Sequence, residues 1–360
     1  MERFSCKTEI LAGSGVIGRL ADCEAKRMML VTDPFFQKNG TARKVVLAAK
    51  AEAAEIFDKV TPEPTVTLAA EGAARVKAFQ PDLIVALGGG SAMDCAKAMA
   101  FFGSGKYRFA AIPTTSGSGS EVTNFAILTH NGVKHPLVDE KLRPDLAILD
   151  SDLLRELPRG LIADSGFDVL AHALEACCAK NRSSFTDCLA RDAFRMAYTS
   201  LPRSYAGDLS VRLEVHKASA MAGLSFTQAG LGICHALSHA LGGAFHVPHG
   251  RLNAILLPAV LACNAPGAQT HYAALARAAG FSASSDAMAL RALKNSLVKL
   301  RRDLGLPETL AQAGVDLRAL REQERQIIEA ALRDPCCETN PVTPETHMLR
   351  EILSQVAGHG

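Results

Sequence analysis

The sequence predicts two domains, an α/β domain with a parallel sheet and an all-helical domain after it. Three observations indicate this architecture. The chain has 360 residues, which is more than one ordinary hydrophobic core requires. Apolar, strand-like runs alternate with helical segments as far as residue 150, and helical periodicity dominates from about residue 159. We therefore expect the domains to comprise residues 1–155 and 156–360.

Four apolar runs of the first domain are expected to form buried strands. They are RMMLVTD (27–33), DLIVALGGG (82–90), the start of RFAAIPTTSGSGSE (108–121) and LAILD (146–150). Residues 41–57 are predicted to form one helix, and SAMDCAKAMA (91–100) another. Strands that alternate with helices indicate a parallel sheet with helices on both faces.

Helical periodicity recurs throughout the second domain, and few β-branched runs remain. The clearest segments are FDVLAHALEACC (167–178), DCLARDAFRMAY (187–198), SVRLEVHKASAMAGL (210–224), RLNAILLPAVLACN (251–264) and THYAALARAA (270–279). We expect each of them to form a helix, with no sheet in this half of the chain.

The composition excludes several classes of partner. Hydrophobic residues make up 48% and charged residues 21%, with a net charge of +2 and no long basic run, so neither nucleic acid nor a membrane surface is indicated. No apolar run approaches the ~20 residues of a membrane span. The start MERFSCKTEI lacks the layout of a secretory signal, and the ten cysteines form no disulfide framework. A cytoplasmic protein with free thiols is expected.

Residues 13–18, GSGVIG, match the GxGxxG pattern of dinucleotide-binding loops, and Asp33 follows about twenty residues later. That pattern requires a strand immediately before it, whereas KTEILA is short and alternates poorly. Two interpretations remain. The segment is either a phosphate loop with Asp33 on a ribose, or a turn that closes an N-terminal hairpin.

Two other glycine-rich turns have a more favourable context. Residues 88–91 follow an apolar strand directly and open a helix, which exposes backbone N–H groups that suit a phosphate. Residues 114–120 repeat this plan and add hydroxyl donors. Each turn alone could be a tight connection. Together they indicate a phosphate-bearing ligand beyond the carboxyl ends of the strands.

Four of the eleven histidines lie in the short segment 234–250, namely His235, His239, His246 and His249. The first two are four residues apart and would share one face of a helix. Gly242-Gly243 and Pro248 are expected to end that helix, so that His249 returns on the following turn.

A carboxylate and a further imidazole lie upstream, where Asp168 and His172 are also four residues apart. An acid in the apolar context FDVL is costly unless it is paired. One carboxylate and up to three imidazoles suit Fe²⁺ or Zn²⁺ in an open, catalytic site, because structural zinc usually has thiolates. The alternative is that these are ordinary hydrogen-bonded residues of the core and surface.

The order of the motifs is specific. They are VTD (31–33), GGGSAMD (88–94), PTTSGSGSEVT (113–123), KHPLVDEKLRPDLAILD (134–150), GFDVLAHALEA (166–176), AGLGICHALSHALGGAFHVPHGRLNAILLP (229–258) and NP (340–341). In this combination the chain resembles the iron-containing (group III) alcohol dehydrogenase family over essentially its full length. The resemblance implies an N-terminal NAD-binding α/β domain and a helical, dehydroquinate synthase-like metal domain, with the site in the cleft between them.

The resemblance also implies roles for individual residues. The four metal ligands would be Asp168, His172, His235 and His249. His239 would face the nicotinamide, and it is our candidate for proton relay. His246 has no counterpart among the ligands. Glu175, seven residues after Asp168, could orient a ligand or belong to a polar stripe.

The cofactor residues implied by the resemblance are Asp33, Gly89, Gly90, Ser91, Asp94, Thr114, Thr115, Ser118 and Lys134. GSGVIG falls in the family's N-terminal hairpin and helix start, and not in its phosphate loop. Asp33 keeps its ribose role. Its carboxylate would accept the 2′-hydroxyl of NAD(H) and repel the 2′-phosphate of NADP(H), which favours NAD(H).

The implied activity is metal-dependent interconversion of short-chain aldehydes, such as propanal and acetaldehyde, with primary alcohols. The sequence is closest in look to propanol and ethanol dehydrogenases of bacterial propanediol or ethanolamine utilisation. The family resemblance implies a homodimer or larger homo-oligomer. The likeness to propanediol and ethanolamine enzymes leaves open whether the protein is free in the cytosol or associated with a bacterial microcompartment. Phe226 and Phe245 are candidate pocket walls.

Three alternatives stay open at this point. The substrate could be a diol, lactaldehyde or glycerol. The chain could be an NAD- and metal-dependent lyase that resembles dehydroquinate synthase, although few lysines or arginines accompany the metal-bearing segments. It could also be a degenerate assembly partner, although four converging donors have no use in a scaffold.

Overall fold

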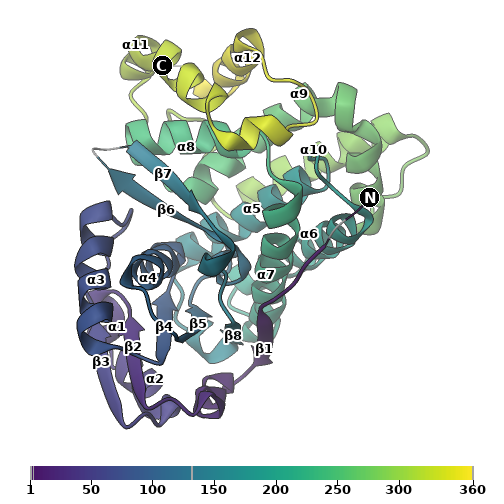
Figure 1. Ribbon diagram of the computed structural model, residues 1–360. Coiled ribbons are helices and arrows are strands. Elements are labelled where there is room, and N and C mark those ends of the chain that lie inside the picture. Colours follow the sequence, from purple (N-terminus) through teal and green to yellow (C-terminus); the bar gives the residue numbers. More distant parts are fainter. Residues whose placement is uncertain (1, 3, 131–132, 359–360) are drawn as a thin grey trace. The chain divides into compact units, whose positions relative to one another are not determined.

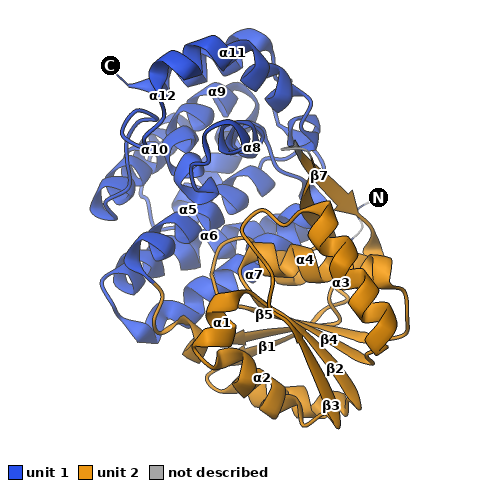
Figure 2. Ribbon diagram, turned by 90° about the vertical axis from the view of Figure 1, so that its left-hand side faces the viewer, with its two compact units in different colours: residues 1–4, 158–360 blue, residues 5–157 orange. Residues whose placement is uncertain are grey.

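The computed structural model describes residue 2 and residues 4–130 and 133–358. The chain divides into two compact units (Figure 2), one formed by residues 5–157 and the other by residues 158–360 with the first four. Within the described residues, no helix is both long and apolar enough to span a membrane.

A parallel sheet organises the unit of residues 5–157, as the sequence predicts, but it has six strands where four were expected. The strand order is β1-β8-β5-β4-β2-β3, and every neighbouring pair is parallel (Figure 1). The strands are β1 (Glu9–Gly13), β2 (Arg27–Val31), β3 (Ala53–Phe57), β4 (Leu83–Gly88), β5 (Arg108–Pro113) and β8 (Leu146–Asp150). A separate antiparallel hairpin, β6 (Phe125–His130) and β7 (Val133–Val138), was not predicted.

Helices cover both faces of this sheet, which explains why its central strands are apolar throughout. They are α1 (Pro34–Lys38), α2 (Thr41–Ala49), α3 (Val66–Phe79) and α4 (Gly90–Gly103). Alternate residues of a strand point to opposite faces. Met29 of β2 therefore packs with Val76 of α3 and Met99 of α4, while Met28 packs with Val45 of α2 on the other side.

The prediction of one helix over residues 41–57 is wrong. Helix α2 ends at Ala49, where Lys50 takes the left-handed conformation (φ 52°), and residues 53–57 form strand β3. All five residues of β3 pair in register with β2. The alanine-rich stretch fits a helix locally, but Phe57 is buried only as part of the sheet.

The predicted N-terminal hairpin is also wrong, because β1 pairs parallel with β8 and not with a following strand. The GSGVIG segment then turns into the 3₁₀ helix η1 (Val16–Cys23). The backbone N–H groups of Gly15 and Ile17 donate to the carboxylate of Asp150, at 3.0 and 2.9 Å. These amides thus bind an anion of the chain itself, and the phosphate-loop interpretation of GSGVIG has no support.

The second unit is helical over its described residues, as predicted. Its helices are α5 (Arg159–Ala176), α6 (Ser184–Tyr205), α7 (Arg212–Ala229), α8 (Ile233–Phe245), α9 (His249–Ala278), α10 (Asp286–Asp303), α11 (Leu317–Leu332) and α12 (Thr346–Ala357). Short 3₁₀ turns complete the chain: η2 (Ser120–Val122), η3 (Glu140–Leu142), η4 (Ser151–Leu154), η5 (Leu209–Val211) and η6 (Pro335–Thr339).

Two predicted helix boundaries in this unit are wrong. Residues 251–264 and 270–279 belong to one helix, α9, which continues through Pro258 and Pro266. Helix α8 runs through Gly242-Gly243 and ends at Phe245, where His246 takes the left-handed conformation (φ 55°) as its C-cap. Glycines in a helix cost about 1 kcal/mol each relative to alanine, which tertiary packing offsets here.

Candidate metal and cofactor sites

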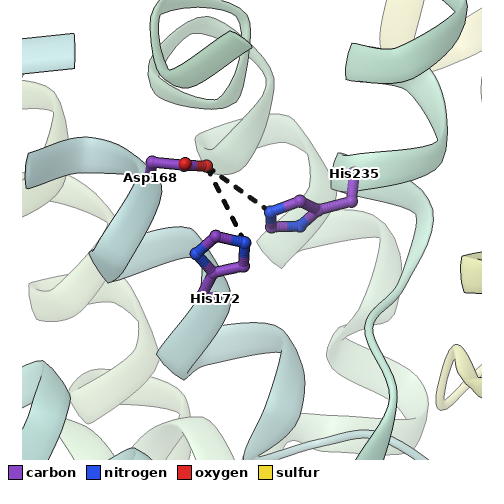
Figure 3. Close-up of side chains that lie close together, drawn as sticks. All are labelled: Asp168, His172 and His235. Atoms are coloured by element: carbon purple, nitrogen blue, oxygen red, sulfur yellow. Dashed lines mark ion pairs between the residues drawn. The ribbon is translucent and has the colours of Figure 1, made fainter. Parts of the chain in front are cut away.

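One oxygen of Asp168 is the point at which the predicted imidazoles meet. Its Oδ1 atom lies 3.9 Å from Nε2 of His172, 3.6 Å from Nε2 of His235 and 3.6 Å from Nε2 of His249. Figure 3 shows Asp168 and His172 on one helix, with His235 facing them from another. The structure therefore brings all four predicted ligands together, although they come from three helices.

The spacing of these donor atoms fits a divalent metal ion. Donors placed ~2.1 Å from one ion in a tetrahedron lie about 3.4 Å from each other, close to the separations from Asp168. The rings of His172 and His235 are stacked at 4.4 Å, and those of His235 and His249 lie 5.3 Å apart. Three imidazoles and one carboxylate, without a thiolate, suit Fe²⁺ or Zn²⁺.

Each predicted ligand is positioned by its place on a helix. Asp168 and His172 lie one turn apart on the buried helix α5, His235 lies in the first turn of α8, and His249 is the first residue of α9. A Cβ atom at Gly250 would lie 1.9 Å from the carbonyl oxygen of Asp164. Only glycine allows α9 to begin so close to α5, and this contact delivers His249 to Asp168.

Electrostatics favour the ionised form of Asp168. Burial alone would raise its pKa, but the imidazoles of His172 and His249 outweigh burial and hold the pKa well below its usual range. For His249, burial disfavours the charged form of the ring and lowers its pKa far below the ordinary value. Asp168 and His249 thus favour the anionic and the neutral form, respectively, which are the protonation states that metal ligands require.

Glu175 contacts the site through His235. Its carboxylate lies 2.6 Å from Nδ1 of His235, and both side chains are buried. The same carboxylate accepts the backbone N–H groups of Gly232 and Cys234 at the start of α8. A carboxylate on Nδ1 leaves the Nε2 lone pair directed at a metal. Burial opposes charge on His235, but Asp168 and Glu175 raise its pKa to about 9, so without an ion the ring also carries a proton on Nε2, which a metal ion would displace.

Asn253 is a residue of the site that the sequence analysis missed. Its Nδ2 atom donates to Oδ1 of Asp168 at 2.7 Å and lies 3.3 Å from Nε2 of His235. Its Oδ1 accepts the hydroxyl of Ser238 at 2.5 Å, which fixes the orientation of the amide. The sequence signal was a single asparagine within the apolar run RLNAILLP, because a buried amide needs hydrogen-bond partners. In the structure Asn253 is fully buried.

The predicted cofactor residues of the other unit gather at the carboxyl ends of three adjacent strands. Asp33 follows β2, the turn 88–91 follows β4, and residues 114–118 follow β5. A Cβ atom at Gly89 would lie 3.3 Å from Oγ1 of Thr115, and one at Gly90 would lie 3.3 Å from Cβ of Ser118. The two loops therefore adjoin, with the N-terminus of α4 between them.

Asp33 caps helix α1 with one oxygen and leaves the other available. Its Oδ1 accepts the backbone N–H groups of Phe35 at 2.9 Å and Phe36 at 3.2 Å. A Cβ atom at Gly88 would lie 3.8 Å from the Oδ2 of Asp33, so the carboxylate lies beside the glycine turn. Gly88 has φ 149°, which disfavours any larger residue there.

Two other predicted cofactor residues, Asp94 and Lys134, have side chains that bind other residues of the same unit. Asp94 accepts the hydroxyl of Ser120 at 2.8 Å and the N–H of Ile127 at 3.1 Å, and burial raises its pKa. Lys134, on β7, forms an ion pair with Glu63 at 2.8 Å. The structure gives Asp94 the geometry of a support for the 118–127 segment.

Two family models match this chain. The model of the iron-containing alcohol dehydrogenase covers residues 7–151, and the C-terminal model of the Fe-containing alcohol dehydrogenase family covers residues 162–357. The chain belongs to the iron-containing alcohol dehydrogenase family. It is an alcohol dehydrogenase, as the resemblance implied.

Known proteins that are similar to this chain in sequence and in fold are also alcohol dehydrogenases. The chain is 37% identical to the 1-propanol dehydrogenase PduQ of Salmonella typhimurium, over 99% of this chain and 100% of that protein. It is 35% identical to an NADPH-dependent butanol dehydrogenase of Clostridium saccharobutylicum, over 95% and 94% of the two chains. A solved iron-containing alcohol dehydrogenase from Thermococcus thioreducens is similar in structure, with a TM-score of 0.90, 33% identity and coverage of 98% and 99%.

In this alcohol dehydrogenase His239 has a partner that the sequence analysis also missed. Its Nδ1 lies 2.7 Å from Oδ2 of Asp334, which caps η6, and its ring stacks on His249 at 5.0 Å. Burial alone would raise the pKa of Asp334, but the hydrogen bond from His239 outweighs it and the pKa falls to about 2. An ionised carboxylate can only accept, so Nδ1 of His239 carries a proton.

The remaining candidates of the sequence analysis are Phe226, Phe245 and His246, and they differ in how close they lie to the predicted ligands. Phe226 stacks on His172 with ring centroids 4.3 Å apart, so it forms one wall beside a predicted ligand. Phe245 is half-buried at the end of α8, and His246 is exposed as the C-cap of that helix. His246 thus lies at the surface.

Proposed function

We propose that the chain is a metal-dependent alcohol dehydrogenase that interconverts short-chain aldehydes and primary alcohols with NAD(H). The observation that carries this proposal is the convergence of three Nε2 atoms on Oδ1 of Asp168, at 3.6–3.9 Å. The donor set contains no thiolate, which is typical of an open catalytic site and not of a structural one.

In this proposal the ion is held by Asp168, His172, His235 and His249. When bound, a divalent ion supplies a Lewis acid for the substrate oxygen and the nicotinamide supplies or accepts the hydride. Glu175 orients His235 through Nδ1, and Asn253 holds the ligating oxygen of Asp168 in place.

His239 is the proposed proton relay. Because Asp334 holds the proton on Nδ1, the ring offers the lone pair of Nε2, which can accept the proton of an alcohol. In aldehyde reduction the same nitrogen returns a proton to the product oxygen. Asp334 acts through His239 as a positioning residue.

The proposed cofactor site comprises Asp33, Gly89, Gly90, Ser91, Thr114, Thr115, Ser118 and Lys134, with Asp94 as a support of the loop. The N-terminus of α4 offers backbone N–H groups for the pyrophosphate. The free oxygen of Asp33 favours a ribose 2′-hydroxyl over a 2′-phosphate. The similarity to a dehydrogenase named as NADPH-dependent makes this choice worth a direct test.

The proposed substrates are propanal and acetaldehyde with their alcohols, supported by the similarity to a 1-propanol dehydrogenase. Diols, lactaldehyde and glycerol stay as alternatives of the same chemistry. The lyase alternative needs cations for a polyanionic substrate, yet Arg251 beside the histidines is paired with Asp164 at 2.9 Å. A cytoplasmic location, a homodimer and microcompartment association stay predictions.

The test is NADH oxidation with propanal by metal-stripped protein, then after anaerobic addition of Fe²⁺ or, separately, Zn²⁺. We expect activity to return only with metal, and His235→Ala to abolish both metal retention and activity. The exposed His246 provides the matched control, since His246→Ala should retain both. Metal binding without any aldehyde reduction would overturn the substrate assignment, and diols and phosphorylated sugars would be the next substrates.

A further inference from the structure

A second group of metal-ligating side chains lies beside the predicted ligands. His239, Asp334 and Cys336 each offer one ligand atom, and these three atoms all lie within 4.8 Å of one another. His239 lies one helical turn after His235, while the other two residues lie at the start of η6. The ring of His239 stacks on that of His249 at 5.0 Å, so the two groups adjoin.

In the structure, hydrogen bonds to Asp334 connect the residues of this second group. Oδ2 of Asp334 lies 2.7 Å from Nδ1 of His239, and its Oδ1 accepts the backbone N–H of Cys336 at 2.8 Å. The Sγ atom of Cys336 lies within 4.8 Å of a carboxylate oxygen of Asp334. One ionised carboxylate thus lies between an imidazole N–H and a thiol, whose protons a metal ion can replace.

We propose that His239, Asp334 and Cys336 form a second site for a thiophilic divalent ion such as Zn²⁺ or Co²⁺, and that this ion inhibits the enzyme. Sulfur, imidazole and carboxylate are the donors that zinc prefers, and three protein ligands leave one position for water. The first group lacks a thiolate, so the two sites differ in the metal they favour.

The charges balance when the ion binds. A divalent ion that meets one carboxylate, one thiol and one neutral imidazole releases a single proton, which comes from the thiol of Cys336. The product holds a carboxylate, a thiolate and a dication, so its net charge is zero. A neutral assembly is the form least penalised in a half-buried position.

Binding at this site would change the tautomer of His239. An ion coordinated by Nδ1 moves the imidazole proton to Nε2, and Nε2–H cannot accept the proton of an alcohol. The inhibitory consequence therefore rests on the proposed relay function of His239, whereas metal binding does not. The side chains of His239 and Asp334 are 30% and 16% exposed, so a hydrated ion reaches them without unfolding of the chain.

Thiolate-to-cobalt charge transfer distinguishes this site from the first group, because no thiol belongs to that group, and cysteine variants then identify the thiol. The full chain is loaded anaerobically with Fe²⁺ and then titrated with Co²⁺. We expect a near-ultraviolet charge-transfer band that saturates at one equivalent of Co²⁺, with the iron retained. The band should disappear in Cys336→Ser and in Cys336→Ala.

The neighbouring thiol provides the matched control. Cys337 is buried and donates to the carbonyl oxygen of Ala331 at 3.0 Å, so Cys337→Ser should keep the band. A wild-type protein without the band, or a Cys336→Ser protein that keeps it, would overturn the site.

Inhibition is measured separately, as the rate of propanal reduction by the iron-loaded enzyme at increasing Zn²⁺. We expect at least a tenfold fall in the wild type and in Cys337→Ser, with iron content unchanged, and less than a twofold fall in Cys336→Ser. Equal inhibition of all three proteins with loss of iron would overturn the proposal in favour of displacement at the first group. A cobalt band without inhibition would keep the site and refute the relay role of His239.

Discussion

The carboxylate of Glu175 lies 2.6 Å from Nδ1 of His235, and both side chains are almost fully buried. This contact joins helix α5 to the start of α8 inside one unit. Because the carboxylate fixes the Nδ1 proton, Nε2 of His235 is the nitrogen that faces Asp168 and that would ligate a metal ion once its proton is displaced. The orientation of a predicted metal ligand thus depends on a second acid from the same helix as Asp168.

Replacement of Glu175 should weaken metal binding more than it weakens the fold. In Glu175→Gln the amide keeps the shape but loses the charge that favours the Nδ1 proton. We expect a 10- to 100-fold loss of metal affinity, the range typical of such outer-shell changes. Competition with a chelator measures it. An unchanged affinity in a folded variant would contradict the role given to Glu175.

Asn253→Ala should loosen Asp168 by removing the donor at 2.7 Å from its Oδ1. We expect about a tenfold loss of metal affinity and an unfolding free energy lower by about 1–3 kcal/mol, because the hydroxyl of Ser238 loses its acceptor. The double variant Ser238→Ala, Asn253→Ala should recover part of the stability but not the affinity. Recovery of both would mean that Asn253 only fills space.

Cofactor preference should follow the charge of Asp33. Asp33→Ser keeps an N-cap for α1 and removes the negative charge, so helix stability changes little. We expect the ratio of kcat/KM for NADPH to that for NADH to rise at least tenfold. Asp33→Glu, which keeps the charge, is the control. An unchanged ratio in the serine variant would place the ribose elsewhere.

The Asp334–His239 pair should control the chemical step and not metal binding by Asp168 and its three histidines. In Asp334→Asn the side-chain amide would donate to Nδ1 and force the proton onto Nε2, the wrong tautomer for accepting a proton. In the iron-loaded enzyme we expect kcat to fall about 100-fold at unchanged iron content. Glu338→Gln, an exposed residue of the same turn, should behave like the wild type. A wild-type kcat in Asp334→Asn would exclude the relay.

A pH-dependent stability is expected from Glu121 in the other unit. Its Oε1 is buried and has no hydrogen-bond partner among the described residues, and burial raises its pKa from 4.5 to about 7, with Lys97 opposing only in part. A raised pKa means that the folded chain binds this proton more tightly than the unfolded chain. The stabilisation is complete below pH 4.5 and is lost as the pH rises through 7.

Glu121→Gln removes this titration. The difference in unfolding free energy between variant and wild type should shift in favour of the variant by on the order of 3 kcal/mol between pH 4.5 and pH 8. Urea unfolding at the two pH values measures it. A constant difference would show that Glu121 ionises in the folded protein without penalty.

Local patterns determined much of this protein from its sequence. The periodicity of a helix puts Asp168 and His172 on one face of α5, and the glycine turns after apolar runs lie at the ends of neighbouring parallel strands. Motif order identified the family, and the donor types indicated a divalent metal. All of these inferences need only neighbouring residues or a motif.

Only the tertiary structure decided the contacts that support these groups. Glu175 and His235 are 60 residues apart, Asn253 and Asp168 are 85 apart, and His239 and Asp334 are 95 apart. Strand β3 likewise exists because β2 offers a partner, although its own residues are compatible with a helix. A side chain's chemistry is visible in the sequence, but its partner is chosen by helix packing that brings distant backbone together, and no local pattern encodes that choice.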